Sequence, residues 1–321
     1  MRCCRFLPVS LPRIAFRALA VLLTAGVVAA CPSVGSVSNP QRPWIVAHRA
    51  GTADAPENTL VAIQSALAHR VDMIWLSVQL SRDGVPVLYR PADLSALTDG
   101  TGPVAGKTLA ELRQRNAGWQ FAVTDADGGK GYPYRTAPVG LPTLDEALAA
   151  IPASVPVILD MKSLPAPPLA AAVAAVLAQH QAWQRVRIYS TEAVFQQAFA
   201  AWPRAQLFES RDATRGRLVD VALARECKSP PPDGTWAGFE MRRNVDVVER
   251  FTLGEGRSGT RAAMWTPASV SCFRADGSTR LLAIGVNDAA AYQEAARLGM
   301  DAVLVDSPRE MAAIRAMPLS P

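Results

Sequence analysis

The sequence has few of the residues from which metal and nucleophile sites are most often built. Its 321 residues include three histidines and five cysteines. It has no C-x-x-C pair and no cysteine–histidine spacing typical of zinc sites. No stripe of basic residues is interleaved with aromatics, so nucleic-acid binding has no support. No internal repeat is visible either.

The first thirty residues have the composition of an export signal. Four arginines precede or enter an apolar run at 18–30, which is too short to span a bilayer comfortably. The run ends in Val28-Ala29-Ala30-Cys31, which resembles a bacterial lipobox. We expect residues 1–30 to be a signal peptide, and residues 31–42 to be a flexible tether that begins with a lipidated Cys31. Ordinary secretory cleavage at the same place is the alternative.

Removal of that signal changes the charge and the cysteine count of the chain. The sequence has 33 basic and 28 acidic residues, and four of the basic residues lie in the signal, so the remainder carries 29 against 28. We expect a nearly neutral protein, exported to the bacterial periplasm and anchored in the membrane by its N-terminal lipid. Cys227 and Cys272 remain, and in an oxidising compartment they either pair or stay two separately buried thiols.

Residues 43–321 alternate apolar, branched runs with stretches rich in alanine and leucine. This pattern predicts an α/β fold, a closed (β/α)₈ TIM barrel. The expected strands are 44–48, 73–79, 155–161, 185–190, 205–209, 235–240, 281–286 and 301–306. The expected helices are 58–69, 143–151, 167–180, 192–201, 216–227, 288–298 and 308–316.

Three segments depart from the alternation. Residues 85–89 are expected to be an extra excursion after the second strand. Residues 91–140 hold many Gly, Pro, Asp and Thr residues, and we interpret them as an insertion after the second strand. Residues 253–280 contain four glycines, and a hairpin or a long loop is expected there.

The order of motifs resembles that of the glycerophosphodiester phosphodiesterases, a phospholipase-C-like barrel family. Residues 48–51 are close to the family's H-R-G, and residues 56–59 match its P-E-N-T. Residues 83–90 follow most of its D-G-x-x-V-x-x-H pattern. Residues 160–162 resemble its E-x-K, and residues 301–308 resemble its last strand, so the similarity covers about the whole mature domain.

The resemblance also implies a metal site, of which little is expected to remain. In the family, a Ca²⁺ or Mg²⁺ ion is held by an E-x-D pair and a later acid, and two histidines share proton transfer. We place Leu76 and Val78 at the E-x-D positions and Arg90 at the second histidine. Asp160 would be the one retained metal ligand. No cofactor is therefore expected, unless a rebuilt site binds Ca²⁺ or Mg²⁺.

The retained residues define a candidate site at the carboxyl end of the barrel. His48 is the candidate acid or base, and four residues are candidates for substrate binding: Arg49, Glu57, Arg90 and Lys162. The alternative is that these residues are relics of the fold, with His48 capping a strand end. Four other polar strand ends, any of which could supply a substitute acid, are Glu209, Glu240, Asp306 and Tyr189.

Two functions fit these expectations. In the first, the protein binds a glycerophosphodiester or another phosphate-bearing small molecule, and the standard metal-dependent hydrolysis is lost. In the second, it cleaves such diesters without the metal, with His48 as acid or base and Arg49, Arg90 and Lys162 as a clamp. Bacterial phosphatidylinositol phospholipases C resemble the second state, because they place an arginine where other members place calcium. A sugar-processing barrel has only the fold in its favour.

Overall fold

The computed structural model describes residues 42–275 and 277–319, which lie within one compact unit, Asn39–Pro321. The expected signal peptide, Cys31 and all but the last residue of the tether lie outside the described residues. None of the helices in the described ranges has both the length and the apolarity needed to cross a bilayer.

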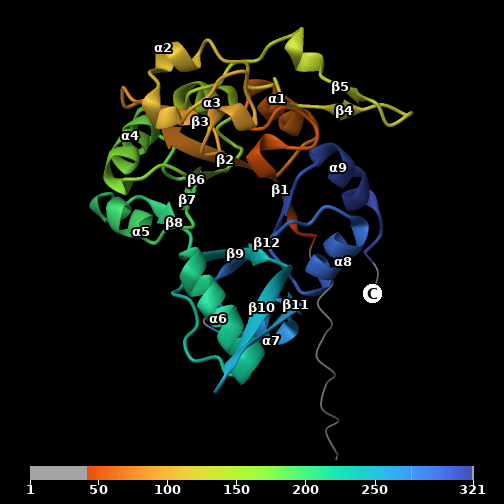
Figure 1. The fold of residues 1–321 in the computed structure, drawn as a ribbon. Coiled ribbons are helices and arrows are strands. Elements are labelled where there is room, and N and C mark those ends of the chain that lie inside the picture. Colours follow the sequence, from red (N-terminus) through yellow and green to blue (C-terminus); the bar gives the residue numbers. More distant parts are fainter. Residues whose placement is uncertain (1–41, 276, 320–321) are drawn as a thin grey trace, which may run out of the picture. The chain divides into compact units, whose positions relative to one another are not determined.

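Eight parallel strands form a nearly closed barrel, and most helices lie outside it (Figure 1). In barrel order these strands are β1 (Trp44–Ala47), β2 (Met73–Leu80), β6 (Val157–Met161), β7 (Val186–Tyr189), β8 (Gln206–Leu207), β9 (Trp236–Glu240), β12 (Arg280–Ile284) and β13 (Ala302–Val305). β13 pairs with β1, and a single bridge between Phe208 and Trp236 connects β8 to β9. The predicted barrel is confirmed.

The strands separate two apolar layers. One cluster consists only of strand and strand-end residues, so it fills the barrel interior: Val46, Met73, Trp75, Ile158, Tyr189, Phe208, Trp236, Leu282, Ala302 and Leu304. The other cluster joins the opposite strand faces to the helices and is much larger. Because successive strand residues point to opposite faces, membership in one cluster or the other fixes the direction of each side chain.

This division corrects the expected register of β2. Trp75 lies in the interior cluster, with its ring centroid 4.6 Å from that of Tyr189. Leu76 and Val78 belong to the outer cluster. Ser77 shares the face of Trp75 and is fully buried. The placement of Leu76 and Val78 on the face of the site is therefore wrong by one residue, and Trp75 and Ser77 occupy that face.

Six of the eight outer helices begin at a short polar side chain that caps them. The eight are α1 (Leu60–Ala68), α3 (Leu144–Ala150), α4 (Ala166–Gln179), α5 (Val194–Ala198), α6 (Arg211–Ala224), α7 (Pro267–Phe273), α8 (Ala289–Arg297) and α9 (Pro308–Ala316). The side chains that accept a backbone N–H at a helix start are Thr59, Thr143, Ser210, Thr266, Asp288 and Ser307. α6 begins five residues before its expected start.

The segment after β2 has a small core of its own. β3 (Pro86–Leu88) pairs antiparallel with β2, which is the expected excursion. The following elements are η2 (Leu94–Ala96), η3 (Val104–Gly106), α2 (Leu109–Leu112), β4 (Val123–Thr124), β5 (Lys130–Gly131) and η4 (Pro133–Arg135). Tyr89, Leu94, Val104 and Leu112 are buried together there. The segment is thus packed rather than an open loop.

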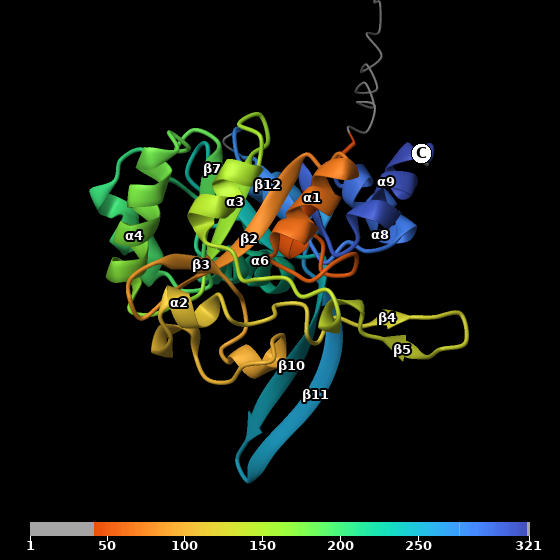
Figure 2. The ribbon, with the colours of Figure 1, turned by 90° about the horizontal axis from the view of Figure 1, so that it is seen from above.

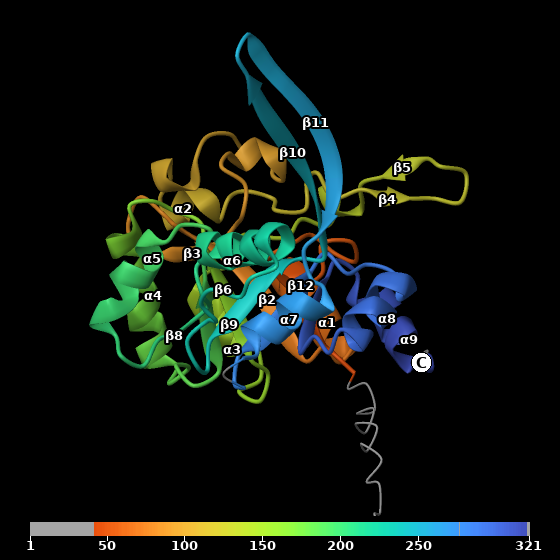
Figure 3. The same cartoon turned by 90° about the horizontal axis from the view of Figure 1, so that it is seen from below.

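A long hairpin projects from the barrel. β10 (Arg242–Phe251) and β11 (Gly254–Ala263) pair over ten residues each, and most of their side chains are exposed. Figures 2 and 3 show this ribbon extending away on the side where α2 and the β4–β5 hairpin lie. A hairpin or a long loop is expected within 253–280, whereas the hairpin spans residues 242–263. Helix α7 occupies part of the segment that follows it.

A disulfide joins the two segments that flank the ribbon. Cys227, just after α6, and Cys272, in α7, are bonded with an S–S distance of 2.05 Å and a Cα–Cα distance of 5.4 Å. Of the two alternatives for these cysteines, the structure has the paired one.

Candidate functional site

The site starts where β1 ends. His48 and Arg49 lie in a short 3₁₀ turn, η1 (His48–Ala50), in which Arg49 and Ala50 have φ angles of 49° and 68°. Left-handed backbone at two consecutive non-glycine residues is uncommon and costs conformational energy. The turn is held by a hydrogen bond from Gly51 N–H to the His48 carbonyl and by one from Asn58 N–H to the Arg49 carbonyl. It places the two candidate side chains at the mouth of the barrel.

His48 is oriented by a carboxylate from the neighbouring strand. Its Nδ1 lies 2.6 Å from Oδ1 of Asp306, which directly follows β13. Thr52 donates to the same oxygen at 3.0 Å, and the Asn287 amide donates to Oδ2 at 2.6 Å. The hydrogen bond from His48, with those of Thr52 and Asn287, lowers the pKa of Asp306 to about 2. An ionised Asp306 requires the proton on Nδ1, which leaves Nε2 of a neutral His48 as the basic atom.

Two ion pairs lie beside the histidine. Arg49 Nη1 donates to Glu57 Oε2 at 2.6 Å, with side chains 19% and 11% exposed. Lys162 Nζ lies 2.9 Å from Asp160 Oδ1, with side chains 17% and 7% exposed. Burial raises the pKa of Asp160, although Lys162, Trp75 and Arg49 act in the opposite direction. The turn η1, which carries Arg49, packs against β2, and β2 pairs with the strand that carries Asp160, so both pairs share one region.

The residues in this region do not fit a Ca²⁺ or Mg²⁺ ion. Such hard cations require several oxygen ligands, and carboxylates supply most of the charge. The inward positions of β2 hold Trp75 and Ser77. The carboxylate paired in register with Ser77, Asp160, faces the Lys162 ammonium, and Glu240 at the end of β9 is paired with Arg211. Across residues 42–275 and 277–319, no group of three His, Cys, Asp or Glu side chains has the arrangement of a metal site.

Arg90 is placed at the rim by the segment after β2. The N–H of Tyr89 donates to the Ser77 carbonyl at 3.1 Å, and the Gln79 amide donates to the carbonyls of Tyr89 and Pro91. Arg90 itself is exposed, and no ion pair or hydrogen bond connects its side chain to another described residue. Its guanidinium therefore presents an uncompensated positive charge.

The sequence interpretation missed Arg211. This residue starts α6, and its guanidinium donates to both Glu240 carboxylate oxygens, at 2.6 and 2.7 Å, and to the Tyr189 hydroxyl at 3.2 Å. Tyr189 pairs in register with Asp160, so Arg211 adjoins the same region. The start of α6 at Arg211 could have been predicted, because Ser210 is of a residue type that caps helix N-termini and does so here.

Two of the candidate substitute acids are already paired. Glu240 accepts hydrogen bonds from Arg211, and Glu209 accepts them from Arg217 and Thr214.

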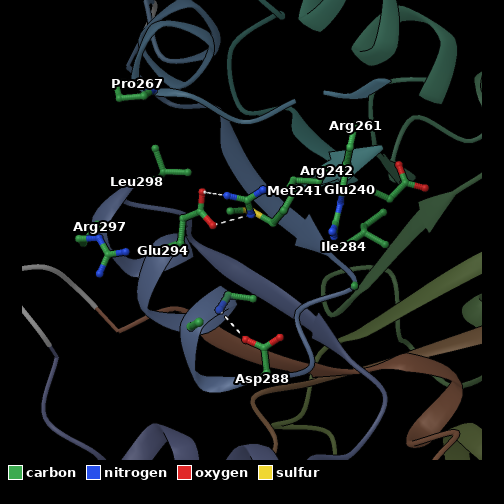
Figure 4. Close-up of a pocket in the computed structure, with 13 residues that line it drawn as sticks. Glu240, Met241, Arg242, Arg261, Pro267, Ile284, Asp288, Glu294, Arg297 and Leu298 are labelled. Carbon is green, nitrogen blue, oxygen red and sulfur yellow. Dashed lines mark hydrogen bonds and ion pairs between the residues drawn. The ribbon is translucent and has the colours of Figure 1, made fainter. Parts of the chain in front are cut away.

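A separate hollow of about 790 Å³ lies between the base of the β10–β11 ribbon and α8. Figure 4 shows Arg242 and Glu294 facing one another there, with two hydrogen bonds of 2.6 and 2.7 Å. Arg261 and Arg297 also line it. Of the candidate residues named from the sequence, Glu240 lines it, whereas His48, Arg49, Glu57, Asp160 and Lys162 do not. We therefore place the candidate site at the barrel mouth and not in this hollow.

Comparison with known proteins agrees with the motifs. "Uncharacterized protein Rv2277c" of Mycobacterium tuberculosis is 48% identical over 285 residues, which cover 89% of this chain and 92% of that protein. The crystal structure of its glycerophosphoryl diester phosphodiesterase domain has a TM-score of 0.80 and 47% identity, and the match covers 86% of this chain and all of that one. A glycerophosphodiester phosphodiesterase of Bacillus subtilis is 33% identical over 36% of this chain and 39% of its own length.

More distant structures share the fold. A phosphodiesterase of Oleispira antarctica, solved with the product sn-glycerol-3-phosphate, has a TM-score of 0.62 at 23% identity over 85% of this chain and 96% of that one. The family model of the glycerophosphoryl diester phosphodiesterase family matches residues 48–310, from the first site histidine to the last helix. The chain therefore belongs to the glycerophosphoryl diester phosphodiesterase family.

Proposed function

We propose that the protein binds a phosphate-bearing small molecule of the glycerophosphodiester type at the mouth of the barrel, without a divalent metal ion. The observation that carries this proposal is the convergence of Arg49, Lys162 and His48 on one end of the barrel, where each is paired with one carboxylate. Positively charged forks and ammonium groups are the usual protein partners of phosphate.

The hydrogen-bond donors at the mouth favour a phosphate over a cation. Arg49 and Lys162 are each matched by one carboxylate, and the exposed Arg90 is offset by the ionised Asp306 beside His48, so the mouth is close to neutral. Arg211 and its partner Glu240 add no net charge. A phosphate would gain charge-assisted hydrogen bonds from guanidinium and ammonium groups, whereas a free cation would meet only carboxylates that are already paired.

Removal of the Arg49 guanidinium should weaken binding of glycerol 3-phosphate by about 1.5–3 kcal/mol, the usual value of a hydrogen bond to a charged group. The measurement is isothermal titration of wild type and Arg49→Ala/Glu57→Gln in the presence of a chelator. The double variant is chosen because Glu57 would otherwise be left buried without its partner. Arg82→Ala is the control, since Arg82 is exposed and pairs with Glu111 away from the mouth. Binding that disappears when the chelator is added to wild type would contradict the proposal.

The His48–Asp306 pair favours a second candidate function, metal-independent cleavage of a phosphodiester. His48 Nε2 would take the proton of the attacking hydroxyl, and Asp306 would stabilise the resulting imidazolium. Arg49, Arg90 and Lys162 would stabilise the phosphoryl oxygens. We rank this function second because a second group that donates a proton to the leaving oxygen is not apparent among the described residues at the mouth. Hydrolysis that resists a chelator and falls roughly 10²–10⁴-fold in His48→Ala would establish it.

We also propose that the protein is an exported lipoprotein, on the basis of the basic segment, the short apolar run and the Val28–Cys31 motif. Cys31→Ser should then leave the membrane fraction or remain unprocessed, because firm anchoring needs the lipid. Fractionation of cells followed by immunoblotting measures this. The proposal fails if the variant is cleaved normally and stays in the membrane fraction.

A further inference from the structure

The hollow between the base of the ribbon and α8 adjoins the mouth of the barrel. Glu240 and Ile284 both line it, and they are the last residues of β9 and β12, paired in register. Asp288 also lines it and follows Asn287, whose amide donates to the Asp306 carboxylate at 2.6 Å. Because the carboxyl ends of the strands form the mouth, the hollow begins at the rim of the candidate site.

Arg211 links the hollow to the ion pairs of the mouth. Its guanidinium donates to both oxygens of Glu240, which lines the hollow, and to the hydroxyl of Tyr189. Tyr189 in turn pairs in register with Asp160, the partner of Lys162. A ligand that is held at the mouth by its phosphate can therefore extend along this side of the barrel into the hollow.

The carboxylates that line the hollow are already bonded. Glu294 accepts two hydrogen bonds from Arg242, and Glu240 accepts two from Arg211. Asp288 caps α8, where its Oδ1 accepts a backbone N–H at 2.8 Å. A cation that entered the hollow would meet these engaged carboxylates, so the lining does not favour a cation.

Two arginines that line the hollow are available instead. Arg261 and Arg297 are exposed, and neither has a hydrogen bond or an ion pair with another described residue. With Arg242, and with the two arginines that pair with Glu240, they bring five guanidinium groups against three carboxylates. Guanidinium groups bind phosphate and carboxylate through paired N–H donors, so the hollow favours an anionic group.

Arg261 is the available arginine on the side of the mouth. It pairs in register with Asn244, which places it on the same face of the ribbon as Arg242. Figure 4 shows its side chain extending towards Ile284, at the end of β12, whereas Arg297 lies on the other side of the Arg242–Glu294 pair. The base of the ribbon thus presents one unpaired guanidinium beside the candidate site.

We propose that the hollow receives a second anionic group, carried by the alcohol part of the ligand, and that Arg261 determines specificity by binding this group. This inference rests on the proposed function, in which the first phosphate lies at Arg49, Lys162 and His48. A neutral alcohol part would leave Arg261 in water, as it is now, and would gain nothing from it. A phosphate or a carboxylate gains charge-assisted hydrogen bonds.

The first experiment compares alkanediol bisphosphates with alkyl monophosphates of the same chain length, at three, five and eight carbons. The length is varied because the second phosphate must reach Arg261 while the first stays at the mouth. Titration of wild type with a chelator present should give, for at least one length, a preference of about tenfold or more for the bisphosphate. Affinities that differ at every length by no more than the statistical advantage of two equivalent phosphates would overturn this inference alone. If neither series binds, the proposed function fails, and this inference fails with it.

The second experiment assigns the preference to one residue. Arg261→Met should abolish the preference for the bisphosphate and leave the affinity for the monophosphate unchanged. Arg297→Met is the matched control, because it removes the same charge from the same hollow at an exposed arginine on the far side of the Arg242–Glu294 pair. It should keep the preference. A preference that survives Arg261→Met, or that falls equally in Arg297→Met, would overturn the assignment. Thermal unfolding checks that both variants fold.

Discussion

Lys162→Met should lower the free energy of unfolding by about 3–5 kcal/mol at pH 7, because it leaves the buried Asp160 carboxylate without its ion partner. Burial already raises the pKa of Asp160, and Lys162 is the largest influence in the opposite direction. Without Lys162 the pKa of Asp160 should rise further. A carboxyl whose pKa is raised in the folded state destabilises the fold above that pKa, and this cost disappears as the pH falls and the group is protonated.

Urea unfolding of Lys162→Met at pH 7 and pH 5 tests this expectation. The difference in free energy of unfolding between wild type and Lys162→Met should be smaller at pH 5 than at pH 7. The double variant Lys162→Met/Asp160→Asn should recover most of the lost stability at pH 7. Arg82→Met is the matched control, because the Arg82–Glu111 pair has side chains 56% and 42% exposed and should contribute no more than about 1 kcal/mol. A deficit in Lys162→Met no larger than that of the control would refute the prediction.

Replacement of Cys227 and Cys272 by alanine should cost about 4 kcal/mol of stability. The bond closes a loop with a sequence separation of 45 residues, and the loss of loop-closure entropy in the unfolded chain gives that magnitude. The measurement is denaturant unfolding of the oxidised wild type against the double alanine variant. Addition of a reductant should lower the free energy of unfolding of the wild type to nearly that of the variant, and it should leave the value for the variant unchanged. A loss below about 1 kcal/mol would mean that this region opens before the barrel unfolds.

The barrel could be predicted because its signals are local and repeated. Each strand is a short apolar run, and six of the eight outer helices start at a side chain that caps a free backbone N–H. The direction of side chains within a strand could not be predicted in the same way. Seven of the eight β2 residues are buried, on both faces of the strand. The sequence therefore shows no alternation of apolar and polar residues that would indicate which side chains point into the barrel. For that reason Leu76 and Val78 were placed where Trp75 and Ser77 lie.

The expected bounds of the ribbon are wrong because its strands are exposed, whereas β2 is buried on both faces. β10 is exposed and carries Arg242, Arg243, Asp246, Glu249 and Arg250, so its sequence has no apolar run. The glycines at 254, 256 and 259 fall in the segment where a hairpin or a long loop is expected, and they lie in the second strand of the ribbon. Exposed two-stranded ribbons lack the burial pattern on which strand prediction depends.

Part of the arrangement of the candidate site could be predicted from local motifs. His48, Arg49 and Glu57 come from two adjacent motifs, and the structure brings them together with Asp160 and Lys162. The roles of Asp306 and Arg211 depend on contacts between distant parts of the chain. Sequence reasoning could place Asp306 at a strand end, but it could not show that His48, 258 residues away, would bond to it.

The position of the disulfide relative to the ribbon has a practical consequence. A protease that cuts the exposed tip between Thr252 and Leu253 would leave Cys227 in one fragment and Cys272 in the other. The fragments would remain covalently linked until a reductant separated them. The first would carry β1 to β9 with His48 and Lys162, and the second would carry β12 and β13 with Asp306. The tip is therefore a natural point at which to divide the barrel into two complementary halves, neither of which holds the complete His48–Asp306 pair.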